Sequence, residues 1–190
     1  MRAYLLVAII TAVVSYLATW AVRYLAKRYD ITPAIRARDV HKTPTPRIGG
    51  VAIFIAIVVG IIVAESFGWF ESVFRDPGPI WAIVGAGGLI VVVGLLDDLI
   101  ELDWTAKMGG QIAAAWILAS GGVQIVSLPI GGLTVGSFGV SLAITVFVVV
   151  LVMNAVNFID GLDGLAAGVV GIGTLAFFVY SYVLAQQTSP

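Results

Sequence analysis

The chain has 190 residues, of which 60% are hydrophobic and 11% are charged, and its formal net charge is −1. This composition excludes an ordinary soluble domain, and the near-neutral charge gives no sign of a nucleic-acid partner. Cysteine is absent and there is one histidine, which excludes disulfides, a thiolate metal site and a multi-histidine centre. We therefore expect an all-α polytopic membrane protein, one membrane domain over residues 1–190. Any metal in it would have oxygen ligands, as Mg²⁺ or Mn²⁺ prefers.

Apolar runs predict about six transmembrane helices, because about 20 residues cross a hydrocarbon core of about 30 Å. The first run is a retained helix rather than a cleaved signal peptide, since basic residues follow it instead of preceding it. A Gly-Gly pair within Leu128–Val135 predicts a short β-hairpin on the outer side, with a Gly-rich loop as the alternative. The predicted spans are Tyr4–Tyr24, Gly50–Phe67, Ile80–Leu96, Lys107–Ser120, Ser141–Met153 and Leu165–Leu184.

Basic residues set the orientation of these spans, because cytoplasmic loops are enriched in lysine and arginine. Most of them lie between the first and second spans, which predicts that this loop is cytoplasmic and that the N-terminus is outside. Counting the spans then places three polar segments on the cytoplasmic face. The basic residues at the end of the first span and in the first loop are Arg23, Lys27, Arg28, Arg36, Arg38, Lys42 and Arg47.

Asp97 and Asp98 end an otherwise apolar segment. Two adjacent like charges near a low-dielectric region repel each other unless a cation compensates, which favours a divalent ion or a phosphate-bound metal. The alternative is a helix-end pair exposed to cytoplasmic water. Lys107 follows ten positions after Asp97. Its ammonium could extend toward lipid headgroups or hold a phosphate that projects from the bilayer.

Two further segments carry polar groups at the same face. Between the last two spans, amides and carboxylates recur every third residue, and their oxygens suit magnesium or hydrogen bonding to a base. The first loop combines cations with stiff prolines and a Gly-Gly pair, which suits a diphosphate; an ordinary positive-inside loop is the alternative. The recurring residues are Asn154, Asn157, Asp160 and Asp163, and the first loop holds Asp39, His41, Lys42, Pro44 and Pro46.

Together the three segments resemble the polyprenyl-phosphate N-acetylhexosamine-1-phosphate transferases, the MraY/WecA-like membrane enzymes of glycosyltransferase family 4. The first loop is closer to the branch that uses UDP-N-acetylglucosamine than to the UDP-MurNAc-pentapeptide branch, which stays the alternative. The matching stretches are Asp39–Gly50, Gly94–Asp98 with Lys107 and Gln111, and Asn154–Leu165.

The resemblance implies transfer of N-acetylglucosamine-1-phosphate from a UDP-sugar to a polyprenyl phosphate, with release of UMP. This would be the first membrane step of a cell-envelope glycan, at the inner face of a bacterial or archaeal cytoplasmic membrane. It implies that Asp97 and Asp98 lie at the reacting centre, that Lys107 holds the lipid phosphate and that Asn157 ligates Mg²⁺. The implied nucleotide-sugar-binding residues are Asp39, His41, Lys42, Asp160 and Asp163.

Members of that family have a longer membrane domain, whose later half carries another magnesium-ligating aspartate and a basic, histidine-containing loop. We therefore expect this chain to be the N-terminal portion of a longer transferase and to be inactive by itself. An ion-coupled transporter is an alternative, which the gathering of acids at one face disfavours. A non-catalytic protein that binds lipid phosphate is another. The oligomeric state stays open, with a homodimer among the alternatives.

Overall fold

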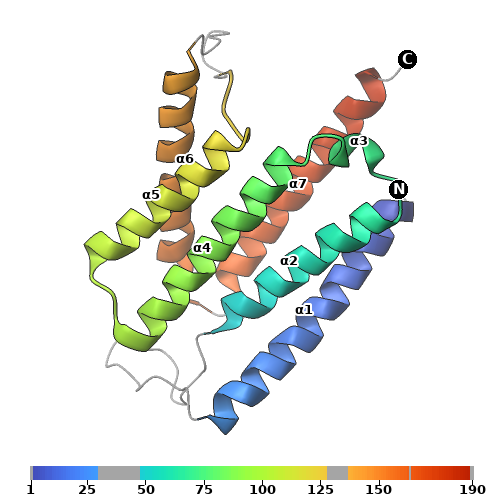
Figure 1. Cartoon of the computed structure of the whole chain (residues 1–190). Helices are drawn as coiled ribbons and strands as arrows, with labels where there is room; N and C mark the ends of the chain where they lie inside the picture. The colour runs from blue at the N-terminus through green and yellow to red at the C-terminus, as the bar shows by residue number, and fades with distance from the viewer. Residues whose placement is uncertain (1, 30–47, 128–136, 163, 189–190) are drawn as a thin grey trace. The chain divides into compact units, whose positions relative to one another are not determined.

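The computed structural model describes residues 2–29, 48–127, 137–162 and 164–188, without the side chains of 185–188. The elements formed by these residues are all helices (Figure 1), which confirms the predicted all-α class. The predicted hairpin over Leu128–Val135 lies outside the described residues. The helices are α1 (Arg2–Arg28), α2 (Gly49–Ser66), α3 (Glu71–Phe74), α4 (Gly78–Ile100), α5 (Trp104–Ser120), α6 (Phe138–Ile159) and α7 (Leu165–Thr188).

Among the described residues, five helices are long and apolar enough to cross a membrane, namely α1, α2, α4, α6 and α7. The remaining predicted span corresponds to α5. Its 17 residues reach about 26 Å, somewhat short of a hydrocarbon core of about 30 Å. The protein is thus a multi-pass membrane protein.

Among the helices that extend beyond their predicted ends, α4 and α6 carry the polar segments. α4 continues through Asp97 and Asp98 to Ile100, and α6 continues through Asn154 to Ile159. The prediction ended each span where the apolar run ended, whereas a helix ends where its backbone hydrogen bonds stop. Asp97 and Asp98, like Asn154 and Asn157, therefore belong to the last helical turns and not, as predicted, to the loops that follow, whereas Asp160 comes after the end of α6.

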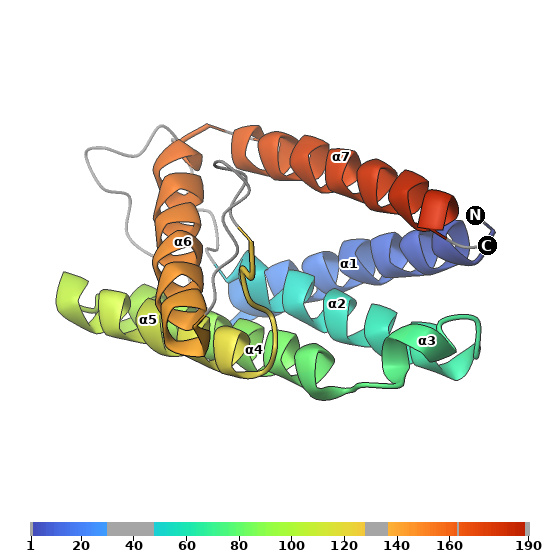
Figure 2. The same ribbon diagram turned by 90° about the horizontal axis from the view of Figure 1, so that it is seen from above.

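The chain divides into two compact units, Met1–Val146 and Phe147–Pro190. In the first unit α1 packs on α2, α2 packs on α4 and α4 packs on α5, so the four helices form a row (Figures 1 and 2). Small residues line these contacts: Ala52, Ala56 and Gly60 are buried on α2 at four-residue spacing. Small side chains let membrane helices approach closely, because lipid removes the hydrophobic drive to bury large ones.

Glycines mark the closest approaches between the helices of the first unit. A Cβ at Gly110 of α5 would come within 2.6 Å of Val93 Cγ2 on α4. A Cβ at Gly121, just after α5, would overlap Ala82 of α4. The pairing of α4 with α5 therefore depends on the absence of side chains at these two positions.

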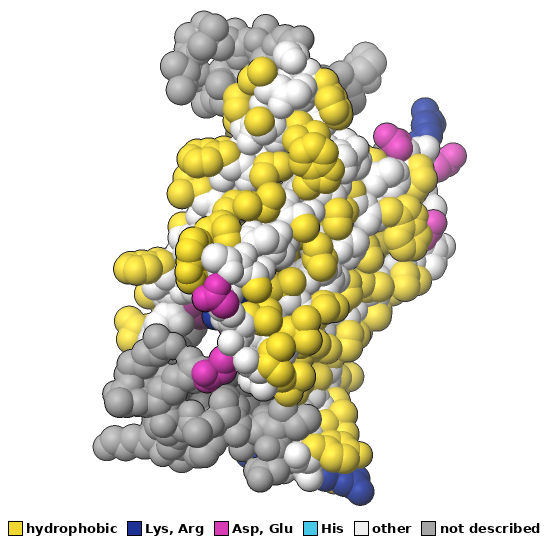
Figure 3. Space-filling model, turned by 60° about the vertical axis from the view of Figure 1, so that its left-hand side comes forward, with side chains coloured by type: hydrophobic (Ala, Val, Ile, Leu, Met, Phe, Trp, Pro, Cys, Tyr) yellow, Lys and Arg dark blue, Asp and Glu magenta, His cyan; other side chains and the backbone are white. Residues whose placement is uncertain are grey.

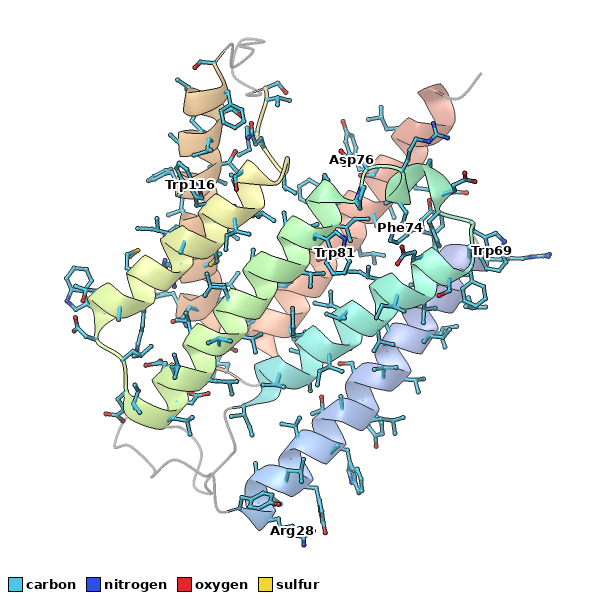
Figure 4. All side chains as sticks on the ribbon, viewed as in Figure 1. Arg28, Trp69, Phe74, Asp76, Trp81 and Trp116 are labelled. Atoms are coloured by element: carbon cyan, nitrogen blue, oxygen red, sulfur yellow. The ribbon has the colours of Figure 1, made fainter. Side chains whose placement is uncertain are left out.

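The row of helices in the first unit has two distinct ends. The tip of α1 at Arg28 lies with the start of α2 and the α4–α5 connection, whereas Trp69 and Asp76 lie at the opposite end (Figure 4). There the rings of Tyr4 and Phe70 meet edge to face, with centroids 5.0 Å apart. The end of α1, the start of α2 and the turn between α4 and α5 thus lie at one end of the row, as the counting of spans predicted. Which side of the membrane this end faces stays a prediction.

Aromatic and charged side chains lie toward these ends. Hydrophobic side chains predominate on the face shown in Figure 3; charged ones lie at its upper and lower right edges and, in its lower left part, above the grey residues. Trp20 stacks on Tyr24 near the basic tip of α1, with ring centroids 5.9 Å apart, and Trp69 stacks on Phe67 at the other end. Tryptophan and tyrosine are enriched at membrane–water interfaces, so this distribution suits a helix row that crosses the bilayer.

A buried polar cluster joins the end of α5 to the first half of α6. Thr145 Oγ1 accepts the backbone N–H of Ile125 at 2.9 Å and donates to the carbonyl of Ser141 at 2.7 Å. Ser141 Oγ lies 2.8 Å from the carbonyl of Ile125 and 3.1 Å from Gln124 Oε1. Ser141 and Thr145 are each 3% exposed. The hydroxyls thus satisfy backbone groups that the irregular segment after α5 leaves unpaired.

Candidate functional site

The last turn of α4 carries an aspartate whose carboxylate has two partners. Asp97 Oδ1 lies 2.8 Å from Lys107 Nζ, and the same oxygen accepts the backbone N–H of Leu102 at 3.1 Å. Both distances are those of ordinary hydrogen bonds to a charged group. The carboxylate of Asp97 therefore fastens the first turn of α5 to the end of α4.

This ion pair is accessible to water. The side chain of Lys107 is 43% exposed and that of Asp97 is 33% exposed. Solvent screening limits the stabilisation from such a pair to about 0–1 kcal/mol. Its main effect is geometric, because it holds the ammonium of Lys107 beside the last turn of α4.

The turn between α4 and α5 depends on a residue in the left-handed backbone region. Glu101 has φ 50° and ψ 73°, and no other non-glycine residue in the described ranges has a positive φ. Its backbone N–H donates to the carbonyl of Asp97 at 3.0 Å. The conformation costs a residue with a Cβ about 1–2 kcal/mol. It reverses the chain so that the next backbone N–H reaches the side chain of Asp97.

Asp103 begins α5 as its N-cap. Its Oδ2 accepts the backbone N–H of Thr105 at 3.3 Å and also the hydroxyl hydrogen of Thr105. These two bonds, the hydroxyl first, hold the pKa of the exposed Asp103 carboxyl below its ordinary value of 3.8. The sequence analysis did not identify this capping role. An aspartate just before the first helical residue is a known helix-start signal that could have revealed it.

Asp98 follows Asp97 in the same helical turn, about 100° further around the axis. It is partly buried and interacts within the chain. The sequence predicted that a cation must compensate this pair of carboxylates. At Asp97 the ammonium of Lys107 provides that compensation.

The second polar segment lies in the second unit, at the end of α6. Asn154 Nδ2 donates to the carbonyl of Val150 at 2.8 Å, so this amide bonds back to its own helix. Asn157 is in the last turn, and the backbone N–H of Asp160 donates to its carbonyl at 3.3 Å. The side chains of Asn157 and Asp160 are exposed. Gly164, with φ +79°, directly precedes α7, which begins at Leu165.

The structure thus brings together part of the predicted site. Asp97 and Lys107 are in direct contact, with Asp98 beside them, and Asn157 and Asp160 share one turn. The functional roles predicted for these residues are not tested by their positions. Four predicted nucleotide-sugar residues, Asp39, His41, Lys42 and Asp163, lie outside the described residues.

The oxygen donors of the described residues fit the chemistry of magnesium. No group of three or more acidic, histidine or cysteine side chains that could hold a metal occurs within the described ranges. Magnesium is commonly held by one or two protein oxygens, together with water and substrate phosphates, rather than by an all-protein cage. The exposed Asn157 amide is a donor of the kind that such a site uses.

Comparisons with known proteins place the chain among the members of one protein family. The model of a family described as Glycosyl transferase family 4 matches residues 80–189. A decaprenyl-phosphate N-acetylglucosaminephosphotransferase of Mycolicibacterium smegmatis is 41% identical over 98% of this chain and 47% of its own length. The chain therefore spans about half the length of the curated relatives it matches.

Two further relatives, with other printed activities, match less of the chain. A probable undecaprenyl-phosphate N-acetylglucosaminyl 1-phosphate transferase of Bacillus subtilis is 35% identical over 76% of the chain and 39% of its own length. A phospho-N-acetylmuramoyl-pentapeptide-transferase of Mycobacterium bovis is 36% identical over 74% of the chain and 45% of its own length. No solved structure matches the chain significantly.

Proposed function

The chain belongs to glycosyl transferase family 4, and from this membership we propose that it takes part in transferring N-acetylglucosamine-1-phosphate from UDP-N-acetylglucosamine to a polyprenyl phosphate. A phosphate oxygen of the lipid attacks the sugar-bearing phosphorus of the donor. The bond between the two donor phosphates breaks, and UMP leaves. The match over 98% of the chain to a decaprenyl-phosphate N-acetylglucosaminephosphotransferase carries the proposal.

The residues at the end of α4 suit the lipid side of this reaction. The Lys107 ammonium would hold the acceptor phosphate, and the Asp97-Asp98 pair would border the reacting atoms. Asn157 would ligate Mg²⁺, and Asp160 would contact the nucleotide sugar. When bound, the ion would neutralise charge that develops on the diphosphate.

The experiment that tests this proposal measures UMP release by membranes containing the full-length gene product. We expect release to require UDP-N-acetylglucosamine, polyprenyl phosphate and Mg²⁺. Asp98→Asn and Asn157→Ala should each abolish it, whereas Glu71→Gln in α3, at the far end of the first unit, should not. Normal turnover in both site variants would refute the site assignment. We also expect residues 1–190 expressed alone to release no UMP.

UDP-MurNAc-pentapeptide is the second candidate donor, because a phospho-N-acetylmuramoyl-pentapeptide-transferase also matches the chain. The higher identity and coverage of the decaprenyl-phosphate enzyme favour UDP-N-acetylglucosamine. Supplying each donor separately to the same membranes distinguishes the two. UMP release with the pentapeptide donor alone would reverse the assignment.

We also propose that the end of the first unit that holds Arg28 and the α4–α5 turn faces the cytoplasm, where nucleotide sugars occur. The chain contains no cysteine, so single cysteines can be introduced without background labelling. Asp103→Cys and Asp160→Cys should react with an impermeant maleimide only from the cytoplasmic side. Asp76→Cys should react only from outside. Labelling of Asp103→Cys and Asp160→Cys from opposite sides would contradict the proposal that both residues face the cytoplasm.

A further inference from the structure

One face of α1 is exposed, and its chemistry changes in order along the helix. The face carries aliphatic side chains first, then aromatic rings, and finally the cations of the last turn. At about 100° per residue, these side chains fall within an arc of similar width around the helix axis. In chain order they are Val13, Leu17, Trp20, Tyr24, Lys27 and Arg28, and each of them is exposed.

The opposite side of α1 packs on α2. Thr11 lies about 180° around the axis from Trp20, and a Cβ added at Gly60 of α2 would overlap the Thr11 hydroxyl. Within the first unit α1 stands at the edge of the row of helices (Figure 1). The exposed face is therefore turned away from α2, where a molecule outside the first unit can lie against it.

Two stacked rings form the middle of this face. The rings of Trp20 and Tyr24 have centroids 5.9 Å apart and planes 13° from parallel, and Trp20 is 66% exposed. Each ring has an apolar body and one polar group, which suits the boundary between acyl chains and headgroups. Lys27 lies nearly in line with Trp20 and about 10 Å further along the axis. Its ammonium thus stands at the level of the headgroups when the rings lie at that boundary.

The charge of this face is not compensated within α1. Arg23 precedes Lys27 by one turn, Arg28 follows it, and the helix contains no aspartate or glutamate. Ion pairs between residues three or four apart therefore do not neutralise these cations. A phosphate beside them would compensate their charge. An anionic headgroup suits the face better than a zwitterionic one, whose own cation offsets its phosphate.

From this order of aliphatic, aromatic and cationic groups we propose that the exposed face of α1 binds an anionic glycerophospholipid. An acyl chain lies along Val13 and Leu17, the glycerol region rests on the Trp20 ring, and the phosphate is held by Lys27 and Arg28. The ligand is a component of the bilayer and takes no part in the transfer reaction, so the proposal stands apart from the proposed function.

The first experiment measures lipid binding to the full-length gene product in detergent by native mass spectrometry. Phosphatidylglycerol should bind more tightly than phosphatidylcholine with the same acyl chains. Lys27→Gln and Arg28→Gln should each weaken phosphatidylglycerol binding about fivefold, as expected for one basic residue at an anionic surface. Arg75→Gln, which removes an exposed cation beside Asp76 at the opposite end of the row, should not.

The aromatic part of the face has its own matched pair of variants. Trp20→Leu keeps the surface apolar but removes the stacked ring, so it should weaken phosphatidylglycerol binding several-fold. Trp81→Leu in α4 replaces a ring that is 69% exposed and should leave binding unchanged. Equal binding of the two phospholipids by the wild type would overturn the proposal, as would equal effects of Lys27→Gln and Arg75→Gln.

Two other occupants of this face would give different results. If the face meets a second copy of the chain, Trp20→Leu and Lys27→Gln should shift the protein from dimer to monomer and leave lipid binding unchanged. If the face holds the acceptor lipid, one equivalent of polyprenyl phosphate should displace phosphatidylglycerol. Either result would overturn the proposal.

Thermal unfolding in mixed micelles provides a second measurement. A ligand that binds only the folded state raises the unfolding temperature. Phosphatidylglycerol should raise it more in the wild type and in Arg75→Gln than in the double variant Lys27→Gln with Arg28→Gln. An equal rise in all three proteins would contradict the site.

Discussion

Adjacent glycines in α5 offer a matched test of how closely α4 and α5 pack beside the site. Gly110 faces Val93 of α4, and a Cβ there would lie 2.6 Å from Cγ2, 3.1 Å from Cγ1 and 3.4 Å from Cβ of that valine. Gly109 has nothing within 4 Å of the same point. Valine is stiff about χ1, so at Gly110 the helices must separate or the valine must adopt a strained rotamer.

The two alanine variants should therefore change stability differently. Each gains about 1 kcal/mol from helix propensity, and this gain cancels in the comparison. Gly110→Ala also pays for overpacking, typically about 1–3 kcal/mol, so it should be less stable than Gly109→Ala by that amount. Reversible unfolding of the purified protein in mixed micelles, followed by circular dichroism, measures the difference.

A rescue variant makes the reasoning more specific. Val93→Ala removes both methyl groups that the new Cβ would meet, so adding it to Gly110→Ala should recover most of the steric loss. Gly110→Ala should also weaken UMP release, because Val93 lies one turn before Asp97 and Gly110 lies about one turn after Lys107. Equal stability of Gly109→Ala and Gly110→Ala would refute the packing described for α4 and α5.

Three further predictions concern other parts of the first unit. Thr145→Val should destabilise the protein by about 1–3 kcal/mol, because a backbone N–H loses its acceptor, whereas Thr174→Val on the exposed face of α7 should be near neutral in the same unfolding assay. The Asp103 cap, whose pKa is lowered on folding, should contribute stability above pH 3.8 that is lost as the pH falls through its folded pKa; unfolding at graded pH should show a shallower acid loss in Asp103→Asn. Gly121→Ala should be destabilising, and Ala82→Gly should rescue it by removing the opposing methyl group.

The class of the protein and the approximate helices follow from hydrophobicity, because an apolar run of sufficient length must lie in the bilayer as a helix. The helix ends do not follow from it. Asp97 and Asn154 were placed at the starts of loops since hydropathy falls there, yet the backbone ladder runs past both. Hydropathy reports what the side chains contact, whereas the helix ends where hydrogen bonding ends.

The local geometry of the site was even less accessible to prediction. Lys107 and Asp97 were each singled out, but their contact depends on a left-handed residue at Glu101, a position where glycine would be the usual choice. No propensity predicts that conformation for glutamate. The cap at Asp103 could have been read from the sequence. The buried pairing of Thr145 with the backbone of Ile125, 20 residues away, could not, because it depends on tertiary packing.

The fate of the donor phosphate tests the central claim most directly. Membranes containing the full-length gene product would be supplied with polyprenyl phosphate and UDP-N-acetylglucosamine labelled with ³²P at the sugar-bearing phosphate. Transfer of sugar-1-phosphate predicts that the label enters the lipid fraction while unlabelled UMP appears in the aqueous phase. Label recovered in aqueous UDP would show transfer of the sugar alone and would contradict the account.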